Sequence, residues 1–337
     1  MRVIAKLDKP LEPLEPEEPP ELPMDFHLNV EKRIKSFRNF CRTHLFLGES
    51  YPSFDVNIGP LSMATYLGAE PIFSEDTVWY TPCVTSGWEQ LKIEYCENSY
   101  WWKLHLEEVR KAKVLAGGDF LINIPDMGES LDILSVMRGA QNFIYDLIDD
   151  PQNVKNLLKL MDKLYFIFYD QMYEVVRDDK GGSSYTTFDI WGPGKTAKVQ
   201  CDFSALMSPH QFKEFFLPSL SYQCSKLDYT LYHLDGIDAI KHLPAVLEVK
   251  DLNAVQWTPG AGKPDGGSED WYPVYDMVKK GDKSLWVSIE DGSFDDWVEK
   301  ADKLVKRYGS DGLYILFPIM EIEMAQELLK KAEKDWK

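Results

Sequence analysis

Short runs of β-branched and aromatic residues alternate with longer amphipathic patterns along most of this 337-residue chain. The runs have the length of strands, and the patterns between them repeat apolar residues at helical spacing. The predicted strands cover 53–58, 119–124, 184–190, 228–234, 252–257, 284–289 and 312–317, with a further one around 91–95. The predicted helices cover 29–43, 129–148, 151–177, 209–226, 237–247, 271–280, 294–307 and 321–336. Strands that are each followed by a helix favour an α/β fold, the (β/α)₈ barrel of the TIM type.

A doubly wound sheet is the main competing architecture. Its first strand should run into a glycine-rich turn that holds phosphate. Here the first strand ends Ile58-Gly59-Pro60-Leu61, and neither GxGxxG nor GxxxxGK[ST] occurs in the sequence. The barrel is therefore favoured, as a single domain over 26–337.

The N-terminal residues, 1–25, have a different composition. Positions 10–25 hold six prolines and six acidic residues and no Lys or Arg. Proline spacing of this kind excludes a helix, and the acids exclude a buried face. We expect an acidic, proline-rich arm that is extended or disordered.

The charge balance restricts the partners of the protein. There are 37 Lys and Arg residues against 55 Asp and Glu residues, which gives a net charge of −18. Such a charge repels nucleic acid and anionic lipid, so we expect neither as a partner. No apolar run is long enough to span a membrane, and the first residues lack the apolar core of a signal peptide, so a cytoplasmic protein is expected.

Polar residues near the carboxyl ends of the strands are candidates for the site, because barrel enzymes keep their chemistry at that end. Side chains alternate between the two faces of a strand, and the apolar set is expected to pack on the helices. The polar members that remain are Asp55 and Asn57, Thr187 and Asp189, His233 and Asp235, Gln256, and Ser288 and Glu290. The resulting acidic mouth suits a small neutral or cationic substrate, or a metal ion.

His233 and Asp235 are the sharpest local feature. Two residues apart on a strand, they project from one face and could bind one metal ion or act as a base with its orienting carboxylate. Alternatively, His233 is hydrogen-bonded to an Asp that caps the next helix. Glu290 is either a third functional carboxylate or part of a helix-capping cluster, and Asp126 is either functional or a turn residue.

Aromatic residues are abundant, with 10 Trp, 17 Tyr and 17 Phe. Trp257 enters a long loop, where it could stack on a planar or sugar substrate or wedge its strand against a helix. The predicted substrate-binding set is Asp55, Asn57, Asp126, Asp189, Trp191, Tyr232, Gln256 and Trp257.

Three stretches carry a resemblance to a known superfamily. They are Leu131-Asp132-Ile133-Leu134 with Arg138-Gly139 and 147–151; Gln200 to Pro209 running into Phe212 to Pro218; and Tyr232-His233-Leu234-Asp235-Gly236. In these stretches the chain resembles the uroporphyrinogen decarboxylase superfamily, which includes the corrinoid-dependent methyltransferases. This resemblance implies the barrel fold and a transfer chemistry that uses a corrinoid carried on a separate protein.

The sequence departs from the superfamily pattern at two points. The decarboxylase binds its polycarboxylate substrate with N-terminal arginines, whereas this chain has the acidic arm there, so that activity is not expected. The methyltransferases that act on thiols hold zinc with His-x-Cys and a second Cys, whereas here Asp235 follows His233 and Phe317-Pro318 stands at the second position. A harder zinc site of His233, Asp235 and Glu290 remains open.

The resulting hypothesis is an enzyme that moves a methyl group from a small N- or O-methylated substrate to a corrinoid protein. His233, Asp235 and Glu290 would be its catalytic residues. One alternative is a carbohydrate-active hydrolase or lyase that uses Asp235 and Glu290 as a carboxylate pair. Another is a barrel that binds a small molecule without catalysis. A homo-oligomer is compatible with all three.

Overall fold

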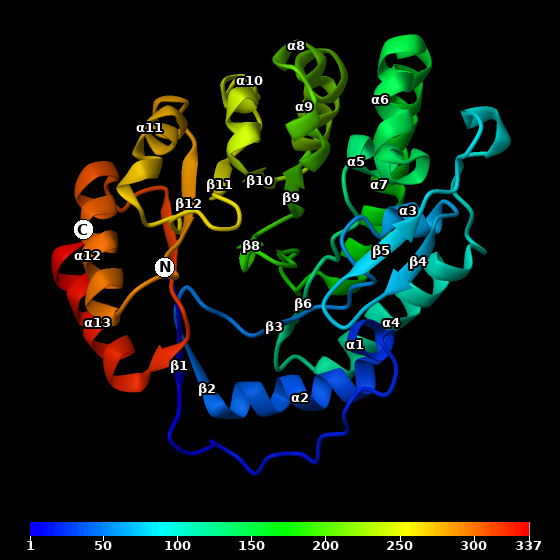
Figure 1. Cartoon of the computed structure of the whole chain (residues 1–337). Helices are drawn as coiled ribbons and strands as arrows, with labels where there is room; N and C mark the ends of the chain where they lie inside the picture. The colour runs from blue at the N-terminus through cyan, green and yellow to red at the C-terminus, as the bar shows by residue number, and fades with distance from the viewer. Residues whose placement is uncertain (337) are drawn as a thin grey trace. The chain divides into compact units, whose positions relative to one another are not determined.

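The computed structural model describes residues 1–336 and divides the chain into two compact units. Unit 1 contains residues 1–16, 37–52 and the chain from 230 onward, and unit 2 contains 17–36 and 53–229. Both units combine helices with parallel strand pairs (Figure 1), which confirms the α/β class. Closure into a (β/α)₈ barrel, and a single domain over 26–337, stay predictions.

Unit 1 contains a sheet of parallel strands. In spatial order they are β14 (Met320–Glu321), β1 (Arg2–Lys6), β13 (Leu313–Leu316), β12 (Ser284–Ser288), β11 (Ala254–Thr258) and β10 (Tyr229–Asp235). β2 (His44–Gly48) pairs with β1 in the antiparallel direction. Leu234, Val255 and Val287 belong to the apolar set that the alternation in the sequence predicts, and all three are buried. Side chains of the opposite set, such as Gln256 and Trp286, are also buried, so these strands are covered on both faces.

The helices of unit 1 follow its strands along the chain. They are η4 (Ile237–His242), α10 (Leu243–Leu247), η5 (Glu269–Trp271), α11 (Tyr272–Lys280), α12 (Phe294–Tyr308) and α13 (Ile322–Asp335). The helical segments predicted in these regions are therefore confirmed. α12 begins at a capping box in which Ser293 and Asp296 bond each other's backbone N–H groups, and it ends at Gly309, whose φ is 76°.

Unit 2 has shorter strand pairs. β3 (Ser53–Phe54) pairs in parallel with β6 (Leu121–Ile122), and an isolated parallel bridge joins Ile124 to Tyr185. Two antiparallel hairpins consist of β4 (Glu70–Phe73) with β5 (Val78–Thr81) and of β7 (Ser183–Tyr185) with β8 (Ile190–Gly192). β9 (Thr196–Gln200) follows the second hairpin.

Most of the helices belong to unit 2. They are α1 (Asp25–Leu28), α3 (Met63–Tyr66), η1 (Trp88–Gln90), α4 (Tyr100–Ala116), α5 (Ser130–Arg138), α6 (Ala140–Asp149), α7 (Pro151–Val176), η2 (Asp202–Leu206), α8 (Pro209–Gln211), the π-helical turn η3 (Phe212–Phe216) and α9 (Leu217–Cys224). α7 has the Asp150 cap and first-turn proline that the sequence predicts. Gly139, at φ 81°, splits the helix predicted over 129–148 into α5 and α6. Among residues 1–336, no helix is both long and apolar enough to cross a membrane.

The N-terminal arm differs in part from its prediction. Residues 2–6 form β1, and three of its residues, Val3, Ile4 and Ala5, are buried in the core of unit 1. From Leu7 to Pro23 the chain has no helix or strand. Acidic residues of this segment pair with basic residues of α2 (Val30–Thr43). The boundary between the two units falls within α2. The ion pairs are Glu12 and Glu15 with Arg42, Glu18 with Lys35, and Glu21 with Lys32. The arm is thus extended and is held along a basic helix.

Aromatic side chains form much of the core of unit 2. Tyr66, Trp102 and Phe168 contact one another with ring centroids 4.8 to 5.2 Å apart. Within this cluster lies His105, which is fully buried. The Tyr66 hydroxyl donates to His105 Nδ1 at 2.6 Å, and His105 Nε2 donates to the Val56 carbonyl at 2.9 Å. Burial lowers the pKa of His105 to about 4.

Stability should therefore depend on pH through His105. Because its pKa is lower in the folded than in the unfolded chain, the unfolded chain binds more protons, and the free energy of unfolding falls as the pH decreases from about 6.5 toward 4. The loss should reach about 3 kcal/mol. The free energy of unfolding can be measured by urea titration at several pH values between 4 and 6.5. His105→Gln should remove this part of its dependence on pH. Equal slopes in the two proteins would contradict the assignment.

Candidate functional site

A row of four side chains crosses the sheet of unit 1. Strand register places His233 beside Gln256, Gln256 beside Trp286, and Trp286 beside Tyr314. Because side chains at one register level of a parallel sheet project from the same face, these four form a continuous strip. The rings of Trp286 and Tyr314 stack with centroids 6.3 Å apart. We call this strip the His233 row.

The imidazole of His233 has a defined orientation. Its Nδ1 is hydrogen-bonded to the side-chain oxygen of Gln256, and the Gln256 amide nitrogen donates to Thr258 Oγ1 at 2.8 Å. An amide oxygen only accepts, so Nδ1 carries the proton and the lone pair of the neutral ring lies on Nε2. Nε2 is therefore the atom that can bind a metal ion or exchange a proton.

Carboxylates lie at the carboxyl ends of the same strands. Asp235 ends β10 and is exposed, on the same face as His233. Glu290 follows β12, is also exposed, and accepts a hydrogen bond from Ser288 Oγ at 2.6 Å. The predicted catalytic residues of unit 1 thus share one end of one sheet.

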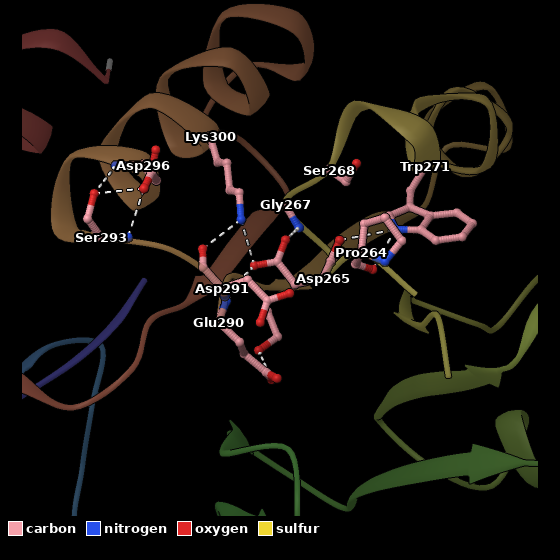
Figure 2. Close-up of polar contacts among 12 residues, drawn as sticks. Pro264, Asp265, Gly267, Ser268, Trp271, Glu290, Asp291, Ser293, Asp296 and Lys300 are labelled. Carbon is pink, nitrogen blue, oxygen red and sulfur yellow. Dashed lines mark hydrogen bonds and ion pairs between the residues drawn. The ribbon is translucent and has the colours of Figure 1, made fainter. Parts of the chain in front are cut away.

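Asp265, in the loop after β11, fixes the position of Glu290 (Figure 2). Its Oδ2 accepts from the backbone N–H groups of Glu290 and Asp291 at 2.7 and 2.8 Å and from Lys300 Nζ at 2.9 Å. Its Oδ1 accepts from the Gly267 N–H at 3.1 Å. The Asp265 side chain is only 4% exposed. The 259–268 loop, the end of β12 and the first turns of α12 are therefore joined through one carboxylate.

Two residues predicted to bind substrate lie away from this face. Tyr232 and Trp257 are 1% and 2% exposed, and both alternate with the residues of the His233 row. Trp257 packs against Trp271 with ring centroids 5.3 Å apart. Of the two interpretations open for Trp257, the structure favours the wedge between strand and helix over the substrate platform.

Unit 2 contains a second polar cluster, which centres on Lys198 of β9 and Asp126 after β6. Both side chains are buried, with exposures of 1% and 9%, and Lys198 Nζ donates to Asp126 Oδ2 at 2.9 Å and to Gln200 Oε1 at 2.6 Å. Asp126 Oδ1 also accepts from the Gly128 N–H at 3.2 Å and from the Tyr185 hydroxyl at 3.3 Å. Burial works to lower the pKa of Lys198, but Asp126 and Glu129 raise it above its usual value.

Further carboxylates surround this ion pair. Glu129 is fully buried, 3.9 Å from Lys198 Nζ, and neither of its oxygens accepts a hydrogen bond from the described residues. Burial raises its pKa well above the usual range. Asp132 accepts from the backbone N–H groups of Asp202 and Phe203, both at 2.9 Å. Burial, and then the charge of Asp202, raise the pKa of Asp132 to about 7. Burial and the neighbouring negative charges therefore favour the neutral form of both carboxyls.

The other predicted residues of unit 2 lie as follows. Asp55 accepts from the Asn123 side chain, and burial raises its pKa. The Asn57 side-chain oxygen is buried and has no hydrogen-bond donor among residues 1–336. Asp126 also contributes to raising the pKa of Asp55, so these two predicted residues share one electrostatic environment.

The strand predicted over 184–190 is wrong in its second half. Thr187 and Asp189 have φ values of 75° and 49°, and the chain turns there from β7 into antiparallel β8. Positive φ is incompatible with a strand, so Asp189 lies in a turn. Trp191 is 44% exposed, and its indole N–H donates to Asp178 at 3.3 Å.

Lys198 and Glu129 are absent from the predicted site residues. No strand is predicted over Thr196–Gln200, because Thr-Ala-Lys-Val-Gln has one strongly apolar residue and follows a Gly-Pro-Gly turn. The alternation of Lys198 with Val199 is the only signal that could have placed Lys198 on a strand face. Glu129 precedes α5, where an acid is typical of a helix start.

Comparison with known proteins gives the fold only. No protein-family model and no curated protein matches the sequence. Among solved structures, a methyltransferase from Methanosarcina mazei is similar, with a TM-score of 0.56 over 84% of this chain and 81% of that one, at 14% sequence identity. The mixed α/β architecture is thus shared with a methyltransferase.

The buried ion pair of unit 2 should be essential for stability. Lys198→Met leaves Asp126 without its cation and should lower the free energy of unfolding by about 3 to 5 kcal/mol. Glu129→Gln replaces a carboxyl group by a neutral amide of the same shape. It should change the free energy of unfolding by less than about 1 kcal/mol. Arg307→Met, which removes an exposed ion pair with Asp276, is the control and should have the smallest effect. Chemical denaturation measures all three, and equal losses for Lys198→Met and Arg307→Met would contradict the assignment.

Proposed function

We propose that this protein is an enzyme that transfers a methyl group from a small N- or O-methylated substrate to a corrinoid carried on a separate protein. The observation that carries the proposal is the oriented imidazole of His233, at the end of a sheet in a fold shared with a methyltransferase. The resemblance of the sequence to the uroporphyrinogen decarboxylase superfamily supports the same chemistry.

The surroundings of His233 suit a neutral or cationic methyl donor. Asp235 and Glu290 are exposed carboxylates, so an anionic substrate would be repelled at this end of the sheet. Trp286 and Tyr314 supply stacked rings on the same row. A quaternary ammonium group is attracted to such rings by cation–π interaction, which makes a methylated amine the favoured substrate class.

The reaction requires that the carbon–heteroatom bond of the substrate breaks as the cobalt–carbon bond of the corrinoid substrate forms. The electron pair of the broken bond stays on the substrate nitrogen or oxygen, and the pair for the new bond comes from the reduced cobalt. For an alkoxide leaving group, His233 first takes up a proton from solvent at Nε2 and then gives that proton to the alkoxide oxygen, which returns the ring to its neutral form. Gln256 accepts from the Nδ1 proton in both states. A tertiary amine leaving group needs no proton.

Zinc is the metal that the resemblance implies for this site. His233 Nε2 and the Asp235 carboxylate are suitable donors on one strand face. In residues 1–336 the Glu290 carboxylate, two strands away, does not lie within 4.8 Å of both donors, so it is not a third ligand in the observed geometry. The ion would act as a Lewis acid toward the substrate heteroatom. Gln256 would then have the role of a partner that fixes the tautomer of a ligating histidine.

Methyl transfer can be measured by the absorbance change of cob(I)alamin on methylation, across a panel of methylated amines and methyl ethers. His233→Ala should abolish the activity, and Gln256→Leu should reduce it by about 10- to 100-fold through loss of ring orientation. His210→Ala is the matched control, because the His210 side chain is 85% exposed, and it should retain full activity.

Two results would refute the proposal. The first is no methyl transfer with any substrate of the panel, and the second is a His233→Ala variant as active as the unmodified protein. Elemental analysis of both proteins separates the two roles of His233: metal lost on substitution indicates a ligand, and activity without metal indicates an acid.

A further inference from the structure

A surface groove in unit 2 lies between α7 and the segment from η3 to α9, separate from the polar cluster around Lys198. Its volume is about 520 Å³, within the range of small-molecule sites. Lys155, Lys159 and Lys163 of α7 line it on one side, and Phe215, Pro218 and Tyr222 line it on the other. The proposed methyl transfer does not use any of these residues.

The three lysines form a stripe along α7. They recur at every fourth position, so they project from one side of the helix at intervals of about 6 Å. Lys155 is neutralised by Glu214, with Nζ 2.7 Å from Oε1. Lys159 and Lys163 are exposed, and within residues 1–336 no carboxylate lies within ion-pair distance of either. The groove therefore presents two uncompensated cations in a protein of net charge −18.

The floor of the groove is apolar, and the buried acid that lines it, Asp162, accepts hydrogen bonds at both of its oxygens. Leu158, Phe215 and Tyr222 supply aliphatic and aromatic surface. Asp162 lies beneath them and is held by the hydroxyls of Ser130 and Ser219, the latter at 2.9 Å. Because both of its oxygens accept hydrogen bonds from the protein, Asp162 opposes an incoming anion less than an exposed carboxylate would.

The backbone at the groove is irregular. Phe212–Phe216 forms a π-helical turn, and Leu217-Pro218 restarts the α-helix. Single π-helical turns within α-helices occur frequently at functional sites, because the extra residue re-aims side chains. Here the turn contains Phe215 and Glu214, which contact Lys155 by a cation–π interaction and by the ion pair.

We propose that this groove binds an amphipathic organic anion, with an apolar or aromatic body and one or two carboxylate or phosphate groups. The body lies on Phe215 and Tyr222, and the anionic groups pair with Lys159 and Lys163. Two charges separated by about 6 Å would engage both lysines at once. Binding in this groove requires neither the methyl transfer nor the His233 row.

The probe for a test is the aromatic sulfonate 1-anilinonaphthalene-8-sulfonate, titrated into the full-length protein and followed by its fluorescence. Reversing both charges, with Lys159→Glu and Lys163→Glu, should weaken binding by about tenfold or more. The matched control is Lys330→Glu with Lys334→Glu on α13, an exposed pair with the same spacing and the same charge change. The control should bind as the unmodified protein does.

A second variant tests the apolar floor. Tyr222→Ala should also weaken binding, and circular dichroism establishes that each variant retains its helices. Unchanged affinity in the Lys159/Lys163 variant would overturn the proposal. An equal loss in the two lysine pairs would overturn it as well, because the effect would then follow net charge and not the groove.

Discussion

The parallel register of β10 to β13 is the constraint on which the candidate site of unit 1 depends. It places one residue of each strand at one level, and the alternation of side chains then places the His233 row and its strand neighbours, such as Tyr232 and Trp257, on opposite faces. A shift of one residue in β10 would bury His233 and bring Tyr232 to the row. The bond from His233 to Gln256 exists only in the observed register, since it joins residues directly opposite each other.

The buried ion pair of unit 2 is the corresponding constraint there. Lys198 and Asp126 come from β9 and from the segment after β6, and each is satisfied by further hydrogen bonds. Burying two charges is unfavourable unless they are in close contact and their other polar atoms are hydrogen-bonded. Only a packing of the two segments that brings Lys198 and Asp126 together meets this condition. The surrounding carboxylates exceed the single cation, and their raised pKa values follow from that excess and from burial.

Sequence reasoning succeeded where periodicity is strong and side chains act independently. Long amphipathic helices such as α7 and α12, and the polar face of β10 and β11, follow directly from spacing. It failed where tertiary context decides: β9 is too polar to be recognised as a strand, and β1 lies beside the proline-rich arm. The turn at Thr187 and Asp189 depends on positive φ angles, which a β-branched Thr does not signal and an Asp signals only weakly. Trp257 was placed correctly beside a loop, but only its packing on Trp271 reveals its face.

Gln256 holds the imidazole of His233 with its proton on Nδ1 and its lone pair on Nε2. A long-range proton–nitrogen NMR correlation spectrum of the imidazole nitrogens, assigned with His233→Ala, measures the tautomer directly. We expect the Nδ1-protonated form at neutral pH, and a shift toward a mixture of tautomers in Gln256→Leu. A ring protonated on Nε2 alone, or a spectrum that Gln256→Leu leaves unchanged, would contradict it.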